Sequence, residues 1–505
     1  MTALAETDLT TSQKTQLAAA AVAQQGKYGV VVNLARQYEL SRPTVYSARN
    51  EAAAVLEEHF GERQDERVGH TIVVDAARLR RAVVGLRPSG CNSIRAIEAL
   101  LPILYDVHKS YGSIEEDLKE AEERAREFNA KADLANVKAG ALDEMFSQGT
   151  PVLAGVDLDS GYLFALSKRE SRGADDWAEV LEVAKKQGLQ LEIVVKDAAL
   201  GIAAGVEKVY PGAEQRDDCF HAKYEMGKVR HRLEQKAYGG IASEEEARRA
   251  LAEERKRGRD IRSAAQQLRR AEERCQQKME LHDAFERAAR QAEEAMEFVD
   301  LQIGRRRTSQ ELESGVVKAA DQMLALDDRH CRRVGRYLRN RAPGLALYMV
   351  ELGEQLCRLD VTYGTDNVDL ACVVLRLAFD LREHRRRWNW HREYRHLWGA
   401  FGQLQHSAGL NMEALLAEVG NLLEHRHRAS SAIEGFNAAL RPHLYVHRIA
   451  TQGFLELFRA YYNLRIRRWG RHKGTSAHEC LTGERVTDWL TKLGYPPSTA
   501  ATVAN

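Results

Sequence analysis

The sequence contains no apolar run approaching the roughly 20 residues that a membrane-spanning helix needs. Its longest apolar stretches, such as residues 17–23 and 30–32, are short and either rich in alanine or interrupted. The N-terminal residues also lack the basic stretch, apolar segment and small-residue cleavage site of a secretory signal. These absences exclude a membrane protein and lead us to expect a cytoplasmic one.

Paired cysteines are missing as well. The 7 cysteines are scattered along the 505 residues, and no two of them form a Cys-x-x-Cys pair. An odd number without paired spacing argues against a disulfide framework and against a four-cysteine zinc site.

Net charge is nearly absent, since 74 Lys and Arg residues face 73 Asp and Glu residues. A balanced total still permits a local basic face on a large protein. Arginines crowd the region from residue 382 to residue 471, among them Arg448, Arg467 and Arg468, and aromatic residues are interleaved with them. This mixture suits phosphate contacts combined with base stacking, although a solvated helix face with inward-pointing aromatics has the same pattern.

Residues 29–50 have the pattern of two short helices joined by a tight turn. Ser41 is placed to cap the second helix, and Pro43 lies in its first turn, where a missing N–H costs little. Four apolar residues would form the core between the helices: Leu34, Ala35, Leu40 and Val45. Four others would point outward to the major groove of DNA: Arg42, Thr44, Tyr46 and Arg49. We therefore expect a helix-turn-helix DNA-binding domain.

A second helical unit follows, with helices predicted at residues 93–104 and from residue 113. Ser113 and Glu116 have the spacing of a capping box at the start of the second helix. The glutamate-rich stretch at residues 115–127 would repel phosphate, so the unit is either a structural linker or a further DNA reader.

Short apolar stretches at residues 137–146, 151–156 and 162–166 are separated by turn residues and predict three strands. An amphipathic helix is predicted at residues 175–186, and an inner strand at residues 189–195. Three hairpin-linked strands, a helix and an inner strand are the order in which a ribonuclease H-like domain begins.

From about residue 223 to residue 425 the pattern is helical and mostly polar. Residues 268, 271, 275 and 279 are spaced by three and four, which predicts a narrow seam for one partner helix. Residues 345–359 and 368–381 are too apolar for a solvated spacer, so we expect a helical domain.

Three acidic residues are candidates for a catalytic site. Asp197 follows the inner strand, at the point where open α/β sheets bind ligands, although a helix cap is the ordinary role there. Glu434 lies in a small, apolar helix, and Asn437 and Arg441 follow on its face. The first acid is either Asp143 or Asp157, and the strand count favours Asp143, since Asp157 would leave too few strands before the helix.

The motifs in this order resemble the DDE transposases of bacterial insertion sequences, whose catalytic domain is ribonuclease H-like. The resemblance rests on Leu-Asp-Glu-Met-Phe at residues 142–146, Lys-Asp-Ala-Ala-Leu-Gly at 196–201, Cys-Phe-His at 219–221 and Ser-Ala-Ile-Glu-Gly-Phe-Asn at 431–437. More than two hundred residues separate Asp197 from Glu434, whereas a minimal domain needs a few tens. The helical region is then an insertion into the catalytic domain.

The resemblance implies an enzyme that binds the terminal inverted repeats of its mobile element, then cuts the DNA and joins it to target DNA. Carboxylates suit two Mg²⁺ ions, for which Mn²⁺ substitutes, and phosphoryl transfer needs no nucleophilic side chain. Asp143 would bridge both ions, and Asp197 and Glu434 would each complete the shell of one. Asn437 and Arg441 would hold the scissile strand or orient Glu434.

Pairing of two DNA ends implies a homodimer or higher oligomer, associated with the bacterial nucleoid when bound to DNA. Cys219 and His221 would point the same way on a strand, which favours packing or a DNA contact over half of a zinc site. The alternative function is a catalytically inactive, transposase-derived DNA-binding regulator or scaffold. The expected fold is multidomain, α and α/β, with five segments: a helix-turn-helix domain at residues 1–65, a second helical domain and linker at 66–135, the ribonuclease H-like core at 136–225 and 425–505, and an all-helical insertion at 226–424.

Overall fold

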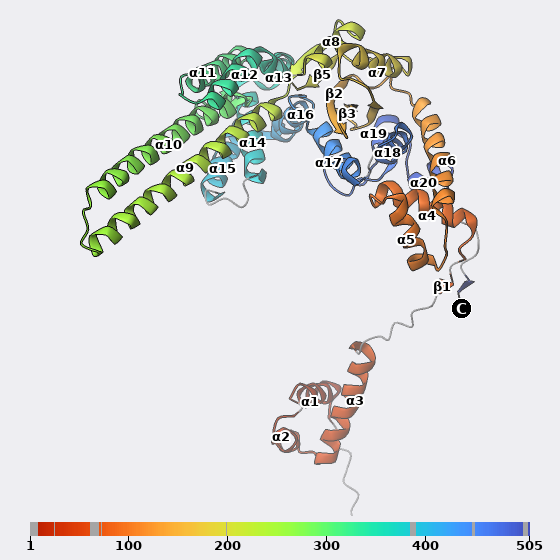
Figure 1. The fold of residues 1–505 in the computed structure, drawn as a ribbon. Coiled ribbons are helices and arrows are strands. Elements are labelled where there is room, and N and C mark those ends of the chain that lie inside the picture. Colours follow the sequence, from red (N-terminus) through yellow and green to blue (C-terminus); the bar gives the residue numbers. More distant parts are fainter. Residues whose placement is uncertain are drawn as a thin grey trace, which may run out of the picture. The chain divides into compact units, whose positions relative to one another are not determined.

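The computed structural model describes residues 9–24, 26–60, 70–71, 73–197, 199–383, 390–446, 450–497 and 503–504. The chain divides into two compact units, one formed by Met1–Asp75 with Ser498–Asn505 and the other by Ala76–Pro497. Figure 1 labels their helices and strands. None of the helices within the described ranges is both long and apolar enough to cross a membrane.

The described residues of the first unit form the helices α1 (Thr11–Ala23), α2 (Val30–Gln37) and α3 (Arg42–Phe60). Two short strands, β1 (His70–Thr71) and β9 (Val503–Ala504), pair antiparallel. The two short helices predicted at residues 29–50 correspond to α2 and the start of α3. The hydroxyl of Ser41 accepts a hydrogen bond from the backbone N–H of Thr44 at the start of α3. Buried residues from all three helices form its core: Leu17, Ala21, Leu34, Ala35 and Val45.

A five-stranded mixed sheet organises the second unit. Its strands lie in the order β4-β3-β2-β5-β6. Their bounds are β2 (Ala139–Ser147), β3 (Thr150–Asp157), β4 (Leu163–Lys168), β5 (Ile193–Lys196) and β6 (Glu214–Asp217). The strands β2, β3 and β4 form an antiparallel meander, whereas β5 and β6 run parallel to β2. The three predicted hairpin strands and the inner strand are confirmed, except that β5 begins at Ile193 and not at residue 189.

Helices cover both faces of this sheet (Figure 1). On one face, α7 (Ala174–Lys186) and α8 (Leu200–Val209) pack on Leu142 and Leu153. On the other face, α17 (Ser431–Val446) and α18 (Gln452–Leu464) pack on Ala141 and Ala154. Because side chains alternate along a strand, Asp143 points to the same face as Ala141, toward α17 and α18.

The helices before the sheet share a core with the C-terminal residues. Their bounds are α4 (Ala76–Ser89), α5 (Ile94–Tyr105) and α6 (Tyr111–Ala130), and they pack against α18 and α20 (Trp489–Lys492); α19 (Ala477–Thr482) lies between the last two in sequence. The expected capping box at Ser113 is wrong, because α6 begins one turn earlier and its cap is Ser110. The helices at residues 76–130 are thus built into the second unit.

The insertion is a helical domain with its own core. Its helices are α9 (Cys219–Lys256), α10 (Arg262–Ala295), α11 (Ser309–Leu324), α12 (Arg329–Ala346), α13 (Tyr348–Tyr363), α14 (Thr365–Glu383), α15 (Trp390–Ala408), the short 3₁₀ helix η1 (Gly409–Asn411) and α16 (Met412–Glu424). The expectation of an all-helical insertion is wrong in one detail, since β7 (Val299–Asp300) pairs with β8 (Arg305–Arg306). The long helices α9 and α10 lie side by side (Figure 1), so the partner helix for the seam at Cys275 belongs to the same chain.

Candidate functional site

Two of the predicted acids lie at neighbouring positions of the parallel pair β2 and β5. In this pairing, Leu142 lies opposite Lys196, the last residue of β5. Asp143 is the next residue on β2 and Asp197 directly follows β5, so the register brings these two carboxylates side by side on the same face of the sheet. Asp197 is half-buried, and its Oδ1 accepts a hydrogen bond of 2.8 Å from the backbone N–H of Ala199, just before α8.

The helix α17 brings the third acid to the same face. Asn437, which is buried, donates a hydrogen bond from its Nδ2 to Oδ2 of Asp143 at 2.5 Å, although 294 residues separate the two in sequence. Glu434 lies three residues earlier, on the same side of α17 and half-buried. The structure therefore gathers Asp143, Asp197 and Glu434 from three segments of the chain.

The pKa of Asp143 reflects its burial and the two acids beside it. Its pKa is raised from 3.8 to about 6, first by burial and then by the negative charges of Asp197 and Glu434. Hydrogen bonds from the backbone N–H of Glu144 and from Asn437 oppose the rise. A carboxylate in this position gains from a nearby cation, because a positive charge offsets both the burial and the like-charge repulsion.

Asp157, the alternative first acid, has a different environment. It lies opposite Gly140 on β2, three residues along the strand from Asp143. Its Oδ2 accepts hydrogen bonds from the backbone N–H of Ser160, at 2.8 Å, and from the Ser160 hydroxyl. Asp157 thus closes the turn between β3 and β4.

Three oxygen-bearing acids are suitable ligands for Mg²⁺, which prefers carboxylate oxygens. Within the part of the chain that the structure describes, however, no three His, Cys, Asp or Glu side chains are arranged so that they hold a metal ion. The donor chemistry fits the ion.

Contacts with the insertion anchor the segment that leads into α17. The carbonyl of Arg428 accepts a hydrogen bond of 3.2 Å from the backbone N–H of Cys219, at the start of α9. The hydroxyl of Ser430 donates to Oδ2 of Asp218. The guanidinium of Arg428 forms an ion pair of 2.6 Å with Glu297. The position of Glu434 therefore depends on the insertion.

Glu297 is the centre of this anchor. Its carboxylate is buried and contacts Lys223 at 2.8 Å and Arg376 at 3.4 Å in addition to Arg428. Although burial acts in the opposite direction, these three cations hold the pKa of Glu297 far below its ordinary value. Nothing in the local sequence around residue 297 indicates this role, because the three cations come from distant segments.

The strand assumed for Cys219 and His221 is wrong, whereas the packing role predicted for Cys219 agrees with its burial. They lie in the first turn of α9 and not on a strand, so residues two apart point in different directions. Cys219 is buried in the insertion core, and burial raises the pKa of its thiol to about 12. His221 is half-exposed, and its ring lies 6.2 Å from that of Tyr337 on α12.

The predicted DNA-contacting residues of the second unit differ in their surroundings. Arg441 is exposed on α17, four residues beyond Asn437, and Arg468 is exposed after α18. The guanidinium of Arg467 is half-buried and donates to the carbonyl of Ser160 in the β3–β4 turn, so part of its role is structural. Arg448 lies outside the described residues.

In the first unit, Arg42, Thr44 and Tyr46 are exposed on α3, as predicted from the sequence. Arg49 is half-buried, with its guanidinium 5.0 Å from the centre of the Tyr46 ring and 2.9 Å from Oδ1 of Asn50. These local contacts order the Arg49 side chain on the surface of α3.

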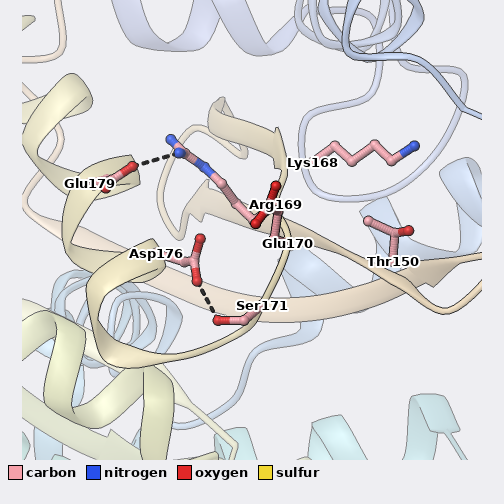
Figure 2. Close-up of a pocket in the computed structure, with 7 residues that line it drawn as sticks. All are labelled: Thr150, Lys168, Arg169, Glu170, Ser171, Asp176 and Glu179. Atoms are coloured by element: carbon pink, nitrogen blue, oxygen red, sulfur yellow. Dashed lines mark hydrogen bonds and ion pairs between the residues drawn. The ribbon is translucent and has the colours of Figure 1, made fainter.

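A separate polar pocket of about 550 Å³ lies between β4 and the start of α7 (Figure 2). Its lining residues partly neutralise one another, since Arg169 forms an ion pair of 2.7 Å with Glu179 and Ser171 donates to Asp176. The three gathered acids do not line it.

No protein-family model matches this chain, and no curated protein is similar enough to count as a match.

Proposed function

We propose that the protein is a DNA transposase of the DDE type, which binds the ends of its mobile element and then cleaves and transfers DNA strands. The observation that carries this proposal is the hydrogen bond between Asn437 and Asp143, because it joins the helix of Glu434 to the strand of Asp143. Asp197 lies beside Asp143 in the strand register. The three acids that the resemblance implies are thus neighbours in the fold.

The sheet topology gives further support. A meander of three antiparallel strands, with two parallel strands added beside the first, is the arrangement expected of a ribonuclease H-like domain. The insertion begins after β6 and ends just before α17, so the catalytic fold is interrupted at one point. The α2–α3 pair of the first unit supplies a candidate reader of duplex DNA.

In this proposal, Asp143, Asp197 and Glu434 would hold divalent magnesium or manganese. When bound, the metal supplies the charge that favours attack on the phosphate and departure of the 3′-oxygen. Asn437 fixes the orientation of the Asp143 carboxylate. Arg441, exposed four residues further along α17, is placed to contact the DNA backbone.

A cleavage assay tests the proposal. The substrate is duplex DNA that carries the sequences flanking the gene, incubated with Mg²⁺ or with EDTA. We expect cleavage by the wild type only with Mg²⁺. Asp143→Asn, Asp197→Asn and Glu434→Gln should each abolish cleavage and retain DNA binding, because an amide is a poor ligand for Mg²⁺.

Asp157→Asn is the matched control and should cleave at close to the wild-type rate. If Asp157→Asn is inactive and Asp143→Asn is active, Asp157 is the first acid. If the wild type binds DNA but never cleaves it, the protein is instead a DNA-binding regulator or scaffold.

A further inference from the structure

The helix α12 carries an unusual concentration of arginine. It contains 6 arginines and no acidic residue among its 18 residues. Its buried side packs into the insertion core through Cys331, Val334 and Leu338. Arg329, Arg333 and Arg336 recur at intervals of four and three, so they form one stripe on its exposed side.

The arginines that flank this stripe have acidic partners. Arg332 forms an ion pair of 3.2 Å with Asp327, and Arg339 forms one of 3.1 Å with Asp321. In contrast, no acidic group in the described ranges lies within ion-pair distance of Arg333 or Arg336. Like charges one turn apart on a helix repel each other, so Arg333 and Arg336 weaken the helix unless an anion binds near them.

The C-terminal end of α12 lies against the last residue of β6, the edge strand next to β5. Arg341 forms an ion pair of 3.0 Å with Asp217, the last residue of β6. A Cβ at Gly344 would lie 2.1 Å from Oδ2 of Asp217, so only glycine permits this approach. The strand beside β6 is β5, which leads directly into Asp197.

The stripe therefore extends outward from the end of β6. Fifteen residues separate Gly344 from Arg329, which corresponds to about 22 Å along a helix. Tyr337, next to Arg336, lies near the carboxylates: burial and the charge of Asp217 raise its pKa, and Asp197 contributes.

We propose that the exposed face of α12 formed by Arg329, Arg333 and Arg336 binds the phosphate backbone of the DNA duplex that is cleaved at Asp143. The stripe spans about 10 Å along the helix axis. That length matches about three nucleotide steps of 3.4 Å on one DNA strand. Guanidinium groups suit this role because their planar donors bind phosphate oxygens in pairs.

This inference rests on the proposed function, since the duplex is the substrate of that reaction. It adds a contact that the helix-turn-helix region does not supply. The insertion then has two roles: it holds the segment before α17 in place, and it binds the DNA that is cleaved at Asp143.

The salt dependence of DNA binding tests the contact. The probe is a fluorescein-labelled 40-base-pair duplex of arbitrary sequence, because phosphate contacts do not depend on sequence. Each lost phosphate contact lowers the slope of log K against log salt by about 0.9. Arg333→Gln/Arg336→Gln should therefore reduce the slope by about 2, equivalent to roughly 30-fold weaker binding at 0.15 M salt if affinities converge at 1 M.

Arg332→Gln/Arg339→Gln is the matched control. It removes the same charge from the same helix, but these arginines are already paired with acids, so the slope should change by less than about 1. Circular dichroism of both double variants should match the wild type, because all four side chains lie on the outer side of α12.

Equal slopes for the two double variants would overturn the proposal. So would a change in sedimentation coefficient with unchanged DNA binding, since that result assigns the stripe to a protein partner or a second copy. The two proposals fail separately. If Arg333→Gln/Arg336→Gln lowers the salt slope of DNA binding but the wild type never cleaves DNA, the transposase proposal is refuted. If the wild type cleaves DNA but this double variant keeps the wild-type salt slope, only the α12 contact is refuted.

Discussion

Replacing Asp143 with asparagine should make the protein more stable in the absence of metal. Asp143 is largely buried, and its pKa is raised from 3.8 to about 6. At 1.36 kcal/mol per pH unit, this rise corresponds to about 3 kcal/mol of unfavourable free energy in the ionised folded state. Asparagine carries no charge, and its carbonyl oxygen accepts the hydrogen bond from Asn437. Its NH2 group then replaces the oxygen that accepts from the backbone N–H of Glu144, which reduces the gain.

The effect depends on pH in a defined direction. The folded state binds the proton more tightly than the unfolded state, so stability falls as pH rises through the interval from 3.8 to about 6. The full cost is present above that interval and absent below it. The advantage of Asp143→Asn should therefore grow from pH 5 to pH 8, to about 1–3 kcal/mol after allowance for screening by solvent.

Thermal unfolding in EDTA, followed by circular dichroism at pH 5 to 8, measures the difference. Asp328→Asn is the control of opposite sign. Although burial acts in the opposite direction, hydrogen bonds from Lys236 and from the backbone N–H groups of His330 and Cys331 hold the pKa of Asp328 at about 2. This variant should lose stability at neutral pH, because asparagine keeps the helix cap but not the charge.

A melting temperature for Asp143→Asn at or below that of the wild type at pH 8 would refute the reasoning. An advantage that does not change with pH would also do so. Addition of Mg²⁺ extends the test: it should raise the melting temperature of the wild type, since a ligand that binds only the folded state stabilises it, and should have little effect on Asp143→Asn.

Three further predictions follow from other contacts. Glu297→Gln leaves buried cations without their partner, so it should destabilise the protein by about 3–5 kcal/mol in thermal unfolding and speed hydrogen exchange in α17. Arg42→Gln should lower the salt slope of DNA binding by about 1, and an unchanged slope would exclude a phosphate contact there. Asn437→Ala removes a donor to Asp143, so the pH at which cleavage reaches half its maximum should move upward from the wild-type value, a shift that a pH–rate profile detects.

Local pattern was sufficient to predict much of the fold. The strands β2, β3 and β4 were predicted from short apolar stretches between turn residues, and Leu34 and Val45 from apolar spacing on two helices. Such signals are local, because each depends on side chains within a few residues. Where a boundary depends on a choice between similar residues, as with Ser110 and Ser113 at the start of α6, the pattern selected the wrong one.

From the sequence, contacts between distant segments could be proposed only as a hypothesis. Asp143 and Asp157 both follow or interrupt strands, and sequence spacing alone does not show which one faces α17. The tertiary structure places Asp143 on the α17 face and ties Asp157 to the turn at Ser160. The strand assumed for Cys219 and His221 was wrong because a helix follows β6.

By itself, the sequence determined the order of the elements, the helix pair α2 and α3, and the candidate acids Asp143, Asp197 and Glu434, since these follow from periodicity and side-chain chemistry within short windows. Only the tertiary structure decided that Glu297 holds the segment before α17 and that α12 touches Asp217. Such contacts depend on how the insertion packs as a whole. Buried charge pairs form where the packed backbone brings acidic and basic side chains from distant segments into contact. No short stretch of sequence specifies which residues will pair.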